Sequence, residues 1–233
     1  MAVTPELLST FAIFKPLPAP VLSELAQQAT LSKFSRRGVV LRAGENIEHL
    51  CFLFEGRLQG VDFTIDGREV GLYFVEPGDF CGEVSIFDHG PQPEFVIALA
   101  SAVVVTVPVQ AMQDIMLKAP SVVNVLGLKL ATRVRRMIFQ RSLLALPNVP
   151  QKVCCQLWEL VPKLDKAAMI EAKISNPPTH MEIAIMLNLS RETVTRVFQS
   201  LQNRQIVKRD GSASLRVLDL ASLEKLANGS EVL

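Results

Sequence analysis

The sequence predicts an α+β protein: a small antiparallel β domain, then a long helix, then a compact helical domain that includes a short hairpin. Turn signals about ten residues apart divide residues 31–107 into short apolar runs, which is typical of antiparallel sandwiches and barrels. Beyond residue 109 the spacing of apolar residues becomes helical. Near the C-terminus, two helices with strong capping signals are separated by only a tight turn.

The bulk composition indicates a folded chain of ordinary domain size. Its 233 residues are 49% hydrophobic and 20% charged, with a net charge of +1, which suits a core-forming protein of two domains. A nucleic-acid partner would therefore need a local basic patch. The first residues carry no Lys or Arg before their apolar run, so we expect no secretory signal and a cytoplasmic protein.

Two features of the composition bear on redox state and membrane contact. The cysteines at 51, 81, 154 and 155 form no C-x-x-C pair, so we expect reduced thiols. Residues 95–113 are free of charge, and on length alone they could span a bilayer. Because this stretch is rich in valine and interrupted by polar residues, we expect buried strands leading into a helix, and no membrane partner.

The β domain is preceded by a helical pattern over residues 5–29, which the segment KPLPAP divides into two short helices. Within the β domain, FTIDGREVGLYFV predicts a hairpin, because Asp66-Gly67 suits the positive φ of a tight primed turn.

Residues 109–145 predict one long helix. Its apolar residues alternate in steps of three and four, as in a coiled-coil seam, and Arg141 interrupts the stripe. An extended helix has little of its own domain to pack on, so we expect a parallel homodimer; packing within the chain is the alternative. Seven Lys or Arg and no acid lie between Ile115 and Trp158, which indicates a solvated face or an anionic partner. The seam consists of Val123, Leu126, Leu130, Val134, Met137 and Leu144.

These elements divide the chain into four parts. Residues 1–108 form the β domain with its N-terminal helices, and 109–145 form the dimerisation helix. Residues 146–150, LPNVP, make a hinge with two prolines, and 151–233 form the C-terminal domain.

The C-terminal domain carries the most specific motif. Thr179 and Glu182 fit a capping box, and Asn188 suits the left-handed turn that ends the first helix. Ser190 caps a second helix whose apolar face is formed by Val194, Val197, Phe198 and Leu201. Two helices joined so tightly predict a helix-turn-helix.

The second helix presents Arg191, Glu192 and Arg196 together near its N-terminal end. Arginine can bond guanine O6 and N7 in parallel, and glutamate can accept from the cytosine amino group. A carboxylate repels phosphate, so its presence favours base reading over an ordinary i, i+4 Glu–Arg pair. We expect phosphate contacts from Ser190 and Thr193.

The remaining phosphate contacts are expected on either side of the second helix. Thr179 lies at the capped start of the first helix. Downstream, IVKRDGSASLRVLD predicts two strands joined at Asp210-Gly211, a wing that places Lys208 and Arg209 toward phosphate.

The chain resembles the CRP/FNR family of bacterial transcription regulators over nearly its whole length. The resemblance rests on PGDFCGEVSIF in the β domain, the long helix, and SRETVTR in a winged helix-turn-helix. The resemblance implies an N-terminal β-roll of the cyclic-nucleotide-binding kind and base reading by Arg191, Glu192 and Arg196. It further implies a double-stranded operator with TGTGA-like half-sites, and an activator that contacts RNA polymerase.

The sensor half departs from the family's pattern. In its cyclic-nucleotide binders, Gly-Glu-Leu precedes an Arg-Ser pair that holds the cyclic phosphate; here Gly82-Glu83-Val84 is followed by Pro93-Glu94. Proline has no cationic fork and no N–H, and a nearby carboxylate opposes phosphate binding by about 1–4 kcal/mol. The polar pair that contacts adenine falls on Met137-Ile138. We therefore expect no binding of cyclic AMP in the usual way.

Three inputs stay open, and no cofactor is certain. A nucleotide effector such as cyclic di-GMP could use the arginines at 133, 135 and 136; the protein could need no small molecule; or it could sense redox or gas. The last is the weakest, because Cys81 is a lone apolar-flanked cysteine. The candidate ligand-site residues are Gly82, Glu83, Val84, Glu94, Arg133, Arg136 and Met137.

Other classes of protein fit less well. A β-roll metalloenzyme needs clustered His and carboxylate ligands, whereas the strands offer only His49 and a distant His89, so we expect neither a metal nor a catalytic site. A signalling module without DNA binding would lack the helix-turn-helix unit at 179–201.

Overall fold

The computed structural model describes residues 2–162, 171–211 and 214–233. The chain forms two compact units, Met1–Arg136 and Met137–Leu233. The division falls inside the long helix α5 (Pro120–Ala145), so the first part of that helix belongs to the β domain and its end belongs to the C-terminal domain.

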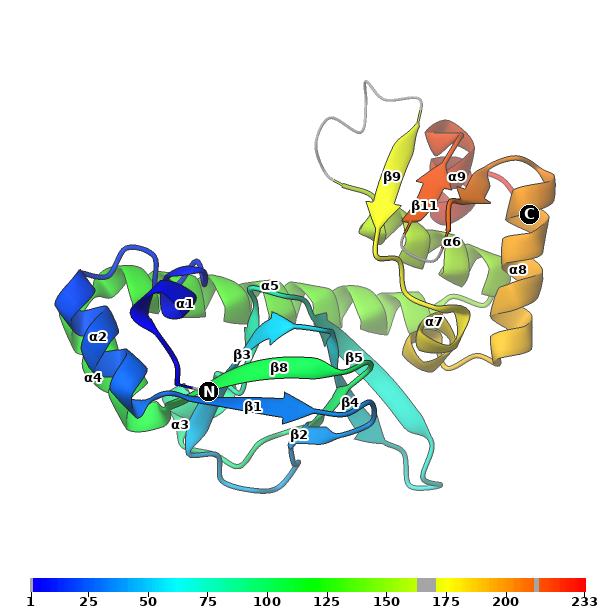
Figure 1. Cartoon of the computed structure of the whole chain (residues 1–233). Coiled ribbons are helices and arrows are strands. Elements are labelled where there is room, and N and C mark those ends of the chain that lie inside the picture. Colours follow the sequence, from blue (N-terminus) through cyan, green and yellow to red (C-terminus); the bar gives the residue numbers. More distant parts are fainter. Residues whose placement is uncertain (1, 163–170, 212–213) are drawn as a thin grey trace. The chain divides into compact units, whose positions relative to one another are not determined.

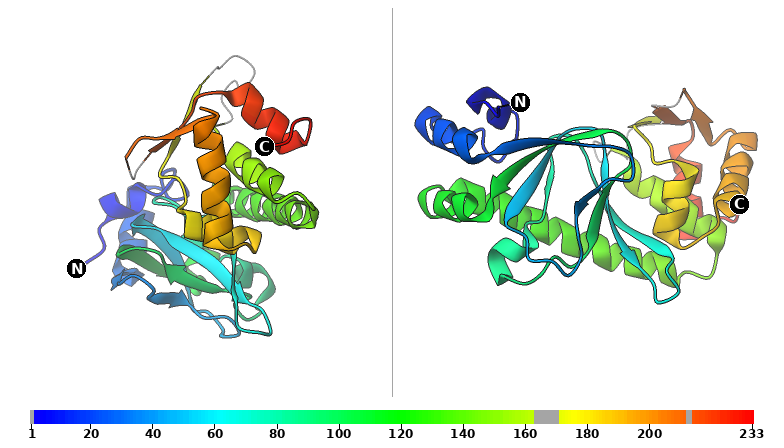
Figure 2. Two further views of the ribbon diagram at one scale, coloured as in Figure 1. Left: turned by 90° about the vertical axis from the view of Figure 1, so that its right-hand side faces the viewer. Right: turned by 60° about the horizontal axis from the view of Figure 1, so that its bottom comes forward.

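The first unit is built on two four-stranded antiparallel sheets, in the orders β1-β8-β3-β6 and β2-β7-β4-β5 (Figure 1). Except for the consecutive strands β4 and β5, neighbours in each sheet come from distant parts of the sequence, as the predicted β-roll requires (Figure 2). The inward faces are apolar, and Leu50, Phe52 and Val105 are fully buried. The strands are β1 (Thr30–Phe34), β2 (Val39–Leu41), β3 (His49–Glu55), β4 (Leu58–Phe63), β5 (Glu69–Val75), β6 (Phe80–Cys81), β7 (Phe95–Ala98) and β8 (Ala102–Pro108).

Short helices flank this β-roll. The two N-terminal helices are present as predicted, α1 (Pro5–Ser9) and α2 (Ala19–Gln28). The short helix α3 (Val84–Asp88) follows β6, and α4 (Val109–Lys118) follows β8. The uncharged stretch 95–113 thus forms β7, β8 and the start of α4, as expected.

The prediction of one unbroken helix over 109–145 is wrong, because α4 and α5 are separate and bent by 118°. Ala119 between them is extended, with φ −135°. Pro120 explains the break: it has no N–H to donate, and its ring disfavours a helical conformation at the residue before it. In the part of the chain that the structure describes, no single helix is long and apolar enough to span a membrane. The bent pair α4 and α5 reaches that length and apolar character only when the two helices are taken together.

The β4–β5 hairpin forms where it was predicted, but its turn is wider than the expected two-residue connection. The loop runs from Thr64 to Arg68 and is closed by the Thr64 N–H, which donates to the Arg68 carbonyl at 2.9 Å. Gly67 alone supplies the positive φ, at 76°.

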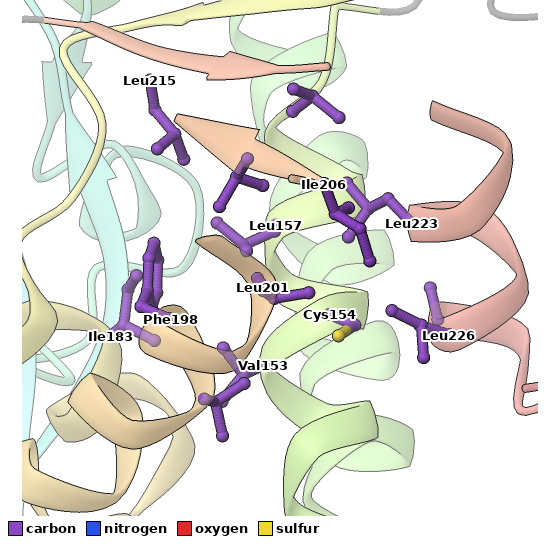
Figure 3. Close-up of a cluster of buried hydrophobic side chains, with 14 of the residues drawn as sticks. Val153, Cys154, Leu157, Ile183, Phe198, Leu201, Ile206, Leu215, Leu223 and Leu226 are labelled. Atoms are coloured by element: carbon purple, nitrogen blue, oxygen red, sulfur yellow. The ribbon is translucent and has the colours of Figure 1, made fainter. Parts of the chain in front are cut away.

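Within its described residues, the second unit combines the end of α5 with four helices and a three-stranded sheet of order β10-β11-β9. Figure 3 shows the core, in which Val153, Cys154 and Leu157 pack with Phe198 and Leu201. Cys154 is therefore a packing residue. The elements are α6 (Val149–Leu160), β9 (Ala172–Ser175), α7 (His180–Leu187), α8 (Arg191–Asn203), β10 (Val207–Arg209), β11 (Ser214–Val217) and α9 (Leu220–Asn228).

The predicted seam on α5 divides into buried and exposed positions. Leu126 is fully buried in the core of the first unit, so it belongs to the sensor domain rather than to a seam. Val134 and Met137, by contrast, are 55% and 67% exposed, and Ile138 and Leu144 are exposed as well. An apolar stripe thus follows the C-terminal half of α5 and is exposed in the part of the chain that the structure describes.

Candidate nucleic-acid interface and sensor site

The helix-turn-helix is fixed by the capping residues that the sequence predicted. The Glu182 N–H donates to the Thr179 hydroxyl at 3.3 Å, and the Thr179 N–H donates to the Glu182 carboxylate at 2.8 Å. Asn188 ends α7 in the left-handed conformation, at φ 52°. The Ser190 hydroxyl then accepts from the Thr193 N–H at 3.1 Å and starts α8.

Helix α8 has one buried face and one charged face. Val194, Val197, Phe198 and Leu201 are buried in the core, as predicted. Arg191, Glu192 and Arg196 are exposed. Hydrogen bonds from the backbone and from Ser190 lower the pKa of Glu192, with help from the two arginines, so the carboxylate is charged at neutral pH.

His180 makes a connection between α7 and α8 that the sequence did not reveal. Its Nδ1 lies 3.0 Å from the Thr195 hydroxyl, and its ring packs on Phe198 with 4.4 Å between centroids. Burial lowers the pKa of His180, and the cations Arg209 and Arg191 lower it further. The ring is therefore neutral at pH 7 and sits next to the predicted base-reading surface.

The predicted wing is present as β10 and β11, with Gly211 at φ 69° in the turn; residues 212–213 lie outside the described part. Lys208 is exposed and Arg209 is half-buried. Strand β9, which the sequence did not reveal, pairs with the other edge of β11. Arg216 lies opposite Lys208 and is paired with Glu171 at 2.6 Å, so Lys208 is the freer of the two cations.

In the sensor domain, one arginine of α5 is buried against two carboxylates. Arg133 Nε lies 2.9 Å from Glu83 Oε1, and Nη1 lies 3.6 Å from Glu94 Oε1. The guanidinium lies over the Tyr73 ring, 3.9 Å from its centroid, and the Tyr73 hydroxyl donates to Glu94. Burial raises the pKa of Glu83, and Arg133 opposes that effect.

The other predicted ligand-site residues are less closely associated with this cluster. Gly82 turns the chain into α3 at φ 89°, and Val84 is the first residue of α3. Arg136 and Met137 are exposed on α5. Tyr73, which the sequence analysis missed, is the central contact; its only sequence signal is that it is the single tyrosine of the chain.

A second ion pair lies one helical turn earlier on α5. Lys129 pairs with Asp79 at the start of β6, and its ammonium lies 5.4 Å from the Phe80 ring centroid. Two of the seven cations that the sequence placed on a solvated face are thus paired with acids of the β-roll. A cavity of about 270 Å³ adjoins them, lined in part by Phe74, Phe80 and Arg136.

Cys81, the lone thiol considered for redox or gas sensing, is buried opposite Cys51 on the neighbouring strand. A hydrogen bond with Cys51 and burial raise its pKa well above the ordinary value for a thiol. Among the described residues, no group of three or more His, Cys, Asp or Glu could hold a metal ion. Cys81 is therefore a core residue with an unreactive thiol.

Comparisons with known proteins match both units. Residues 31–119 match the cyclic nucleotide-binding domain family, and residues 151–226 match the Crp-like helix-turn-helix domain family. A CRP-like cAMP-activated global transcriptional regulator of Mycobacterium tuberculosis is 27% identical over 222 residues, covering 95% of this chain and 97% of the relative.

Two solved structures share the fold. FixK2 from Bradyrhizobium japonicum has a TM-score of 0.72 at 22% identity, covering 85% of this chain and 96% of that one. The c-di-GMP responsive global regulator CLP from Xanthomonas campestris has a TM-score of 0.65 at 19% identity, covering 85% and 98%.

A cyclic-nucleotide-binding type of β-roll joined to a helix-turn-helix defines a transcription regulator with a sensor domain. The chain belongs to the CRP/FNR family. The matched relatives are regulators rather than enzymes, in line with the sequence analysis.

Proposed function

We propose that two copies of this chain bind a DNA palindrome with TGTGA-like half-sites, one half-site for each recognition helix. The observation that carries the proposal is the exposed trio Arg191, Glu192 and Arg196 on α8, opposite a fully packed apolar face. Two guanidinium groups and one carboxylate suit the guanine and cytosine edges of G·C pairs in the major groove. Ser190 and Thr193 lie at the same end of α8 and would hold phosphates. Thr179, Lys208 and Arg209 are proposed as further phosphate contacts.

The exposed stripe on α5 is the surface proposed for the second copy. Val134, Met137 and Ile138 would otherwise leave a run of large apolar side chains in water. A two-fold pair would present two recognition helices, which is what a palindrome requires. Met137→Glu should convert the dimer into a monomer in analytical ultracentrifugation. Met181→Glu, which changes an exposed methionine outside α5, should not.

The sensor is proposed not to hold cyclic AMP in the way implied for the family. The relative from Mycobacterium tuberculosis is described as cAMP-activated, but here the position expected to hold the cyclic phosphate is a buried glutamate, Glu94. A buried carboxylate repels a phosphate, and Pro93 supplies no N–H donor. By the same family resemblance, we propose an activator that contacts RNA polymerase.

Fluorescence anisotropy with a labelled duplex tests the DNA part of this proposal. We expect tighter binding to a palindromic duplex with two TGTGA half-sites about one helical turn apart than to a scrambled duplex of equal length. The difference should be about a thousandfold at physiological salt. The binding constant should also fall steeply with salt, since phosphate contacts release counterions. Equal affinity for both duplexes, or no binding at low salt, would refute sequence-specific recognition.

A further inference from the structure

The interior of the β-roll contains a charge cluster that the DNA-binding surface does not use. Glu83 has no exposed side-chain surface, and the side chains of Glu94 and Arg133 are 7% and 10% exposed. Such burial of three ionisable groups costs free energy unless they are closely paired. They are contributed by three separate segments: the β6–α3 turn, the residue before β7, and α5.

The Tyr73 ring completes the cluster by filling the space between β4 and α5. Tyr73 lies directly opposite Gly60 in the β4–β5 ladder, and a Cβ atom at residue 60 would lie 2.5 Å from the ring. Only a glycine at this position therefore leaves room for the ring as it lies. Arg133 contacts the ring at 3.9 Å from its centroid, so Gly60, Tyr73 and Arg133 are packed in succession.

The charges of this cluster disfavour an anionic ligand. One guanidinium faces two carboxylates, so the cluster already has an excess of acid over base when both are ionised. A phosphate would have to displace a glutamate from Arg133, leaving a buried carboxylate without its counter-ion. The adjoining cavity has a volume of about 270 Å³, which lies at the lower limit of the roughly 300–1,000 Å³ that is usual for small-molecule sites.

We infer that Arg133 and Tyr73 take the place of an effector: they fasten α5 to the β-roll from within, so that this regulator binds its operator without any nucleotide. The Lys129–Asp79 pair reinforces the attachment one helical turn earlier. Since α5 also carries the proposed dimer stripe, its attachment positions the two copies. The inference rests on the proposed function as a DNA-binding dimer, and it selects among the three inputs that the sequence left open.

Nucleotide-free protein provides the first test, which needs no variant. Operator affinity is measured by anisotropy with and without 1 mM cyclic AMP, cyclic GMP or cyclic di-GMP, together with thermal melting of the protein. We expect the dissociation constant to stay within about twofold and the melting temperature to stay unchanged. A tenfold or greater gain in affinity with any of these nucleotides would overturn the inference while leaving the DNA-binding proposal intact. Failure to bind the duplex under every condition would instead overturn the DNA-binding proposal.

Substitutions in the cluster provide the second test. Arg133→Gln should weaken operator binding tenfold or more, and the triple variant Arg133→Gln/Glu83→Gln/Glu94→Gln, which removes the unpaired charges, should recover part of that loss. Arg36→Gln is the matched control, since it removes an exposed arginine from the turn between β1 and β2 and should change nothing. Tyr73→Phe keeps the ring and loses only the bond to Glu94, so it should cost less than the removal of Arg133.

A folding defect is distinguished from a positioning defect by far-ultraviolet circular dichroism and by binding to random duplex. If Arg133→Gln is folded and binds the operator as tightly as the unchanged protein, Arg133 does not position α5 and the inference is wrong. If it does not fold, Tyr73→Ala serves instead, because it removes the ring and leaves Arg133 paired with both carboxylates. Unchanged operator affinity in that variant would likewise refute the inference.

Discussion

The two units use arginine in opposite ways. On α8, Arg191 and Arg196 are exposed on a surface whose other side is packed against the core. On α5, Arg133 is buried, paired with two carboxylates and in contact with an aromatic ring of its own domain. An exposed guanidinium remains available to a partner, whereas a buried and paired one contributes to structure. The difference supports the proposal that this protein recognises DNA with the arginines of one unit, whereas the buried arginine of the other unit stabilises the fold.

The largest effect should come from breaking the buried cluster. Arg133→Met leaves Glu83 and Glu94 without their cation, and removal of one partner of a buried ion pair costs about 3–5 kcal/mol. We expect the urea midpoint of the sensor unit to fall accordingly at pH 7.5. At lower pH the loss should shrink, because the raised pKa of Glu83 lets it take up a proton and become neutral.

A matched comparison uses an exposed ion pair. Arg204→Met removes the partner of Glu231, which lies 3.2 Å away, and both side chains are more than 40% exposed. Solvent-exposed pairs contribute about 0–1 kcal/mol, so the midpoint should hardly move. Equal losses in the two variants would show that burial does not distinguish the two uses of arginine.

The next largest effect should come from the exposed arginines, and it should appear in binding rather than in stability. Arg191→Ala and Arg196→Ala should each weaken binding to the specific duplex by about 1–3 kcal/mol and relax base preference at one position. Neither should lower the melting temperature appreciably. Lys208→Ala should instead weaken binding to every duplex and reduce the salt slope by about 1. A uniform loss on all sequences in the α8 variants would show that these arginines contact phosphate only.

The same contrast explains what the sequence could predict. The helix-turn-helix depends on short-range signals. Thr179 forms a capping box with a residue only three positions later, and asparagine at 188 readily adopts the left-handed conformation that ends the helix. These features, and the exposure of Arg191, Glu192 and Arg196, therefore followed from the sequence. For the two four-stranded sheets, the spacing of the turns predicted the antiparallel class of fold but not the strand order.

The buried cluster could not be predicted in the same way. Arg133 pairs with Glu83 and Glu94, which are 50 and 39 positions away in sequence, and contacts Tyr73 of β5. Nothing local distinguishes it from the exposed arginines at 135 and 136, and all three were candidates for binding a ligand. Its pairing depends on the fold, as does the removal of Leu126 from the expected dimer seam.

A smaller effect is expected from the local signals themselves. Thr179→Ala removes the hydroxyl that accepts from the Glu182 N–H, and loss of such a cap costs about 1 kcal/mol. Thermal melting of the second unit should show a decrease, while Thr179→Ser should behave like the unchanged protein. If the alanine variant melts at the same temperature, the capping box does not contribute to holding α7 in place.

The smallest expected effect is a pH dependence of the second unit that comes from His180. The pKa of His180 is lowered in the folded chain by burial, and then by Arg209 and Arg191. The unfolded chain therefore binds the proton first, so this contribution to stability is complete above the unfolded value of about 6.5 and is lost as pH falls through the folded pKa. His180→Gln should flatten that part of the stability profile between pH 7.5 and 5, and His89→Gln, an exposed histidine of the sensor, should leave it unchanged. An identical slope in the His180 variant would mean that the contact of this ring with Thr195 and Phe198 does not depend on its protonation state.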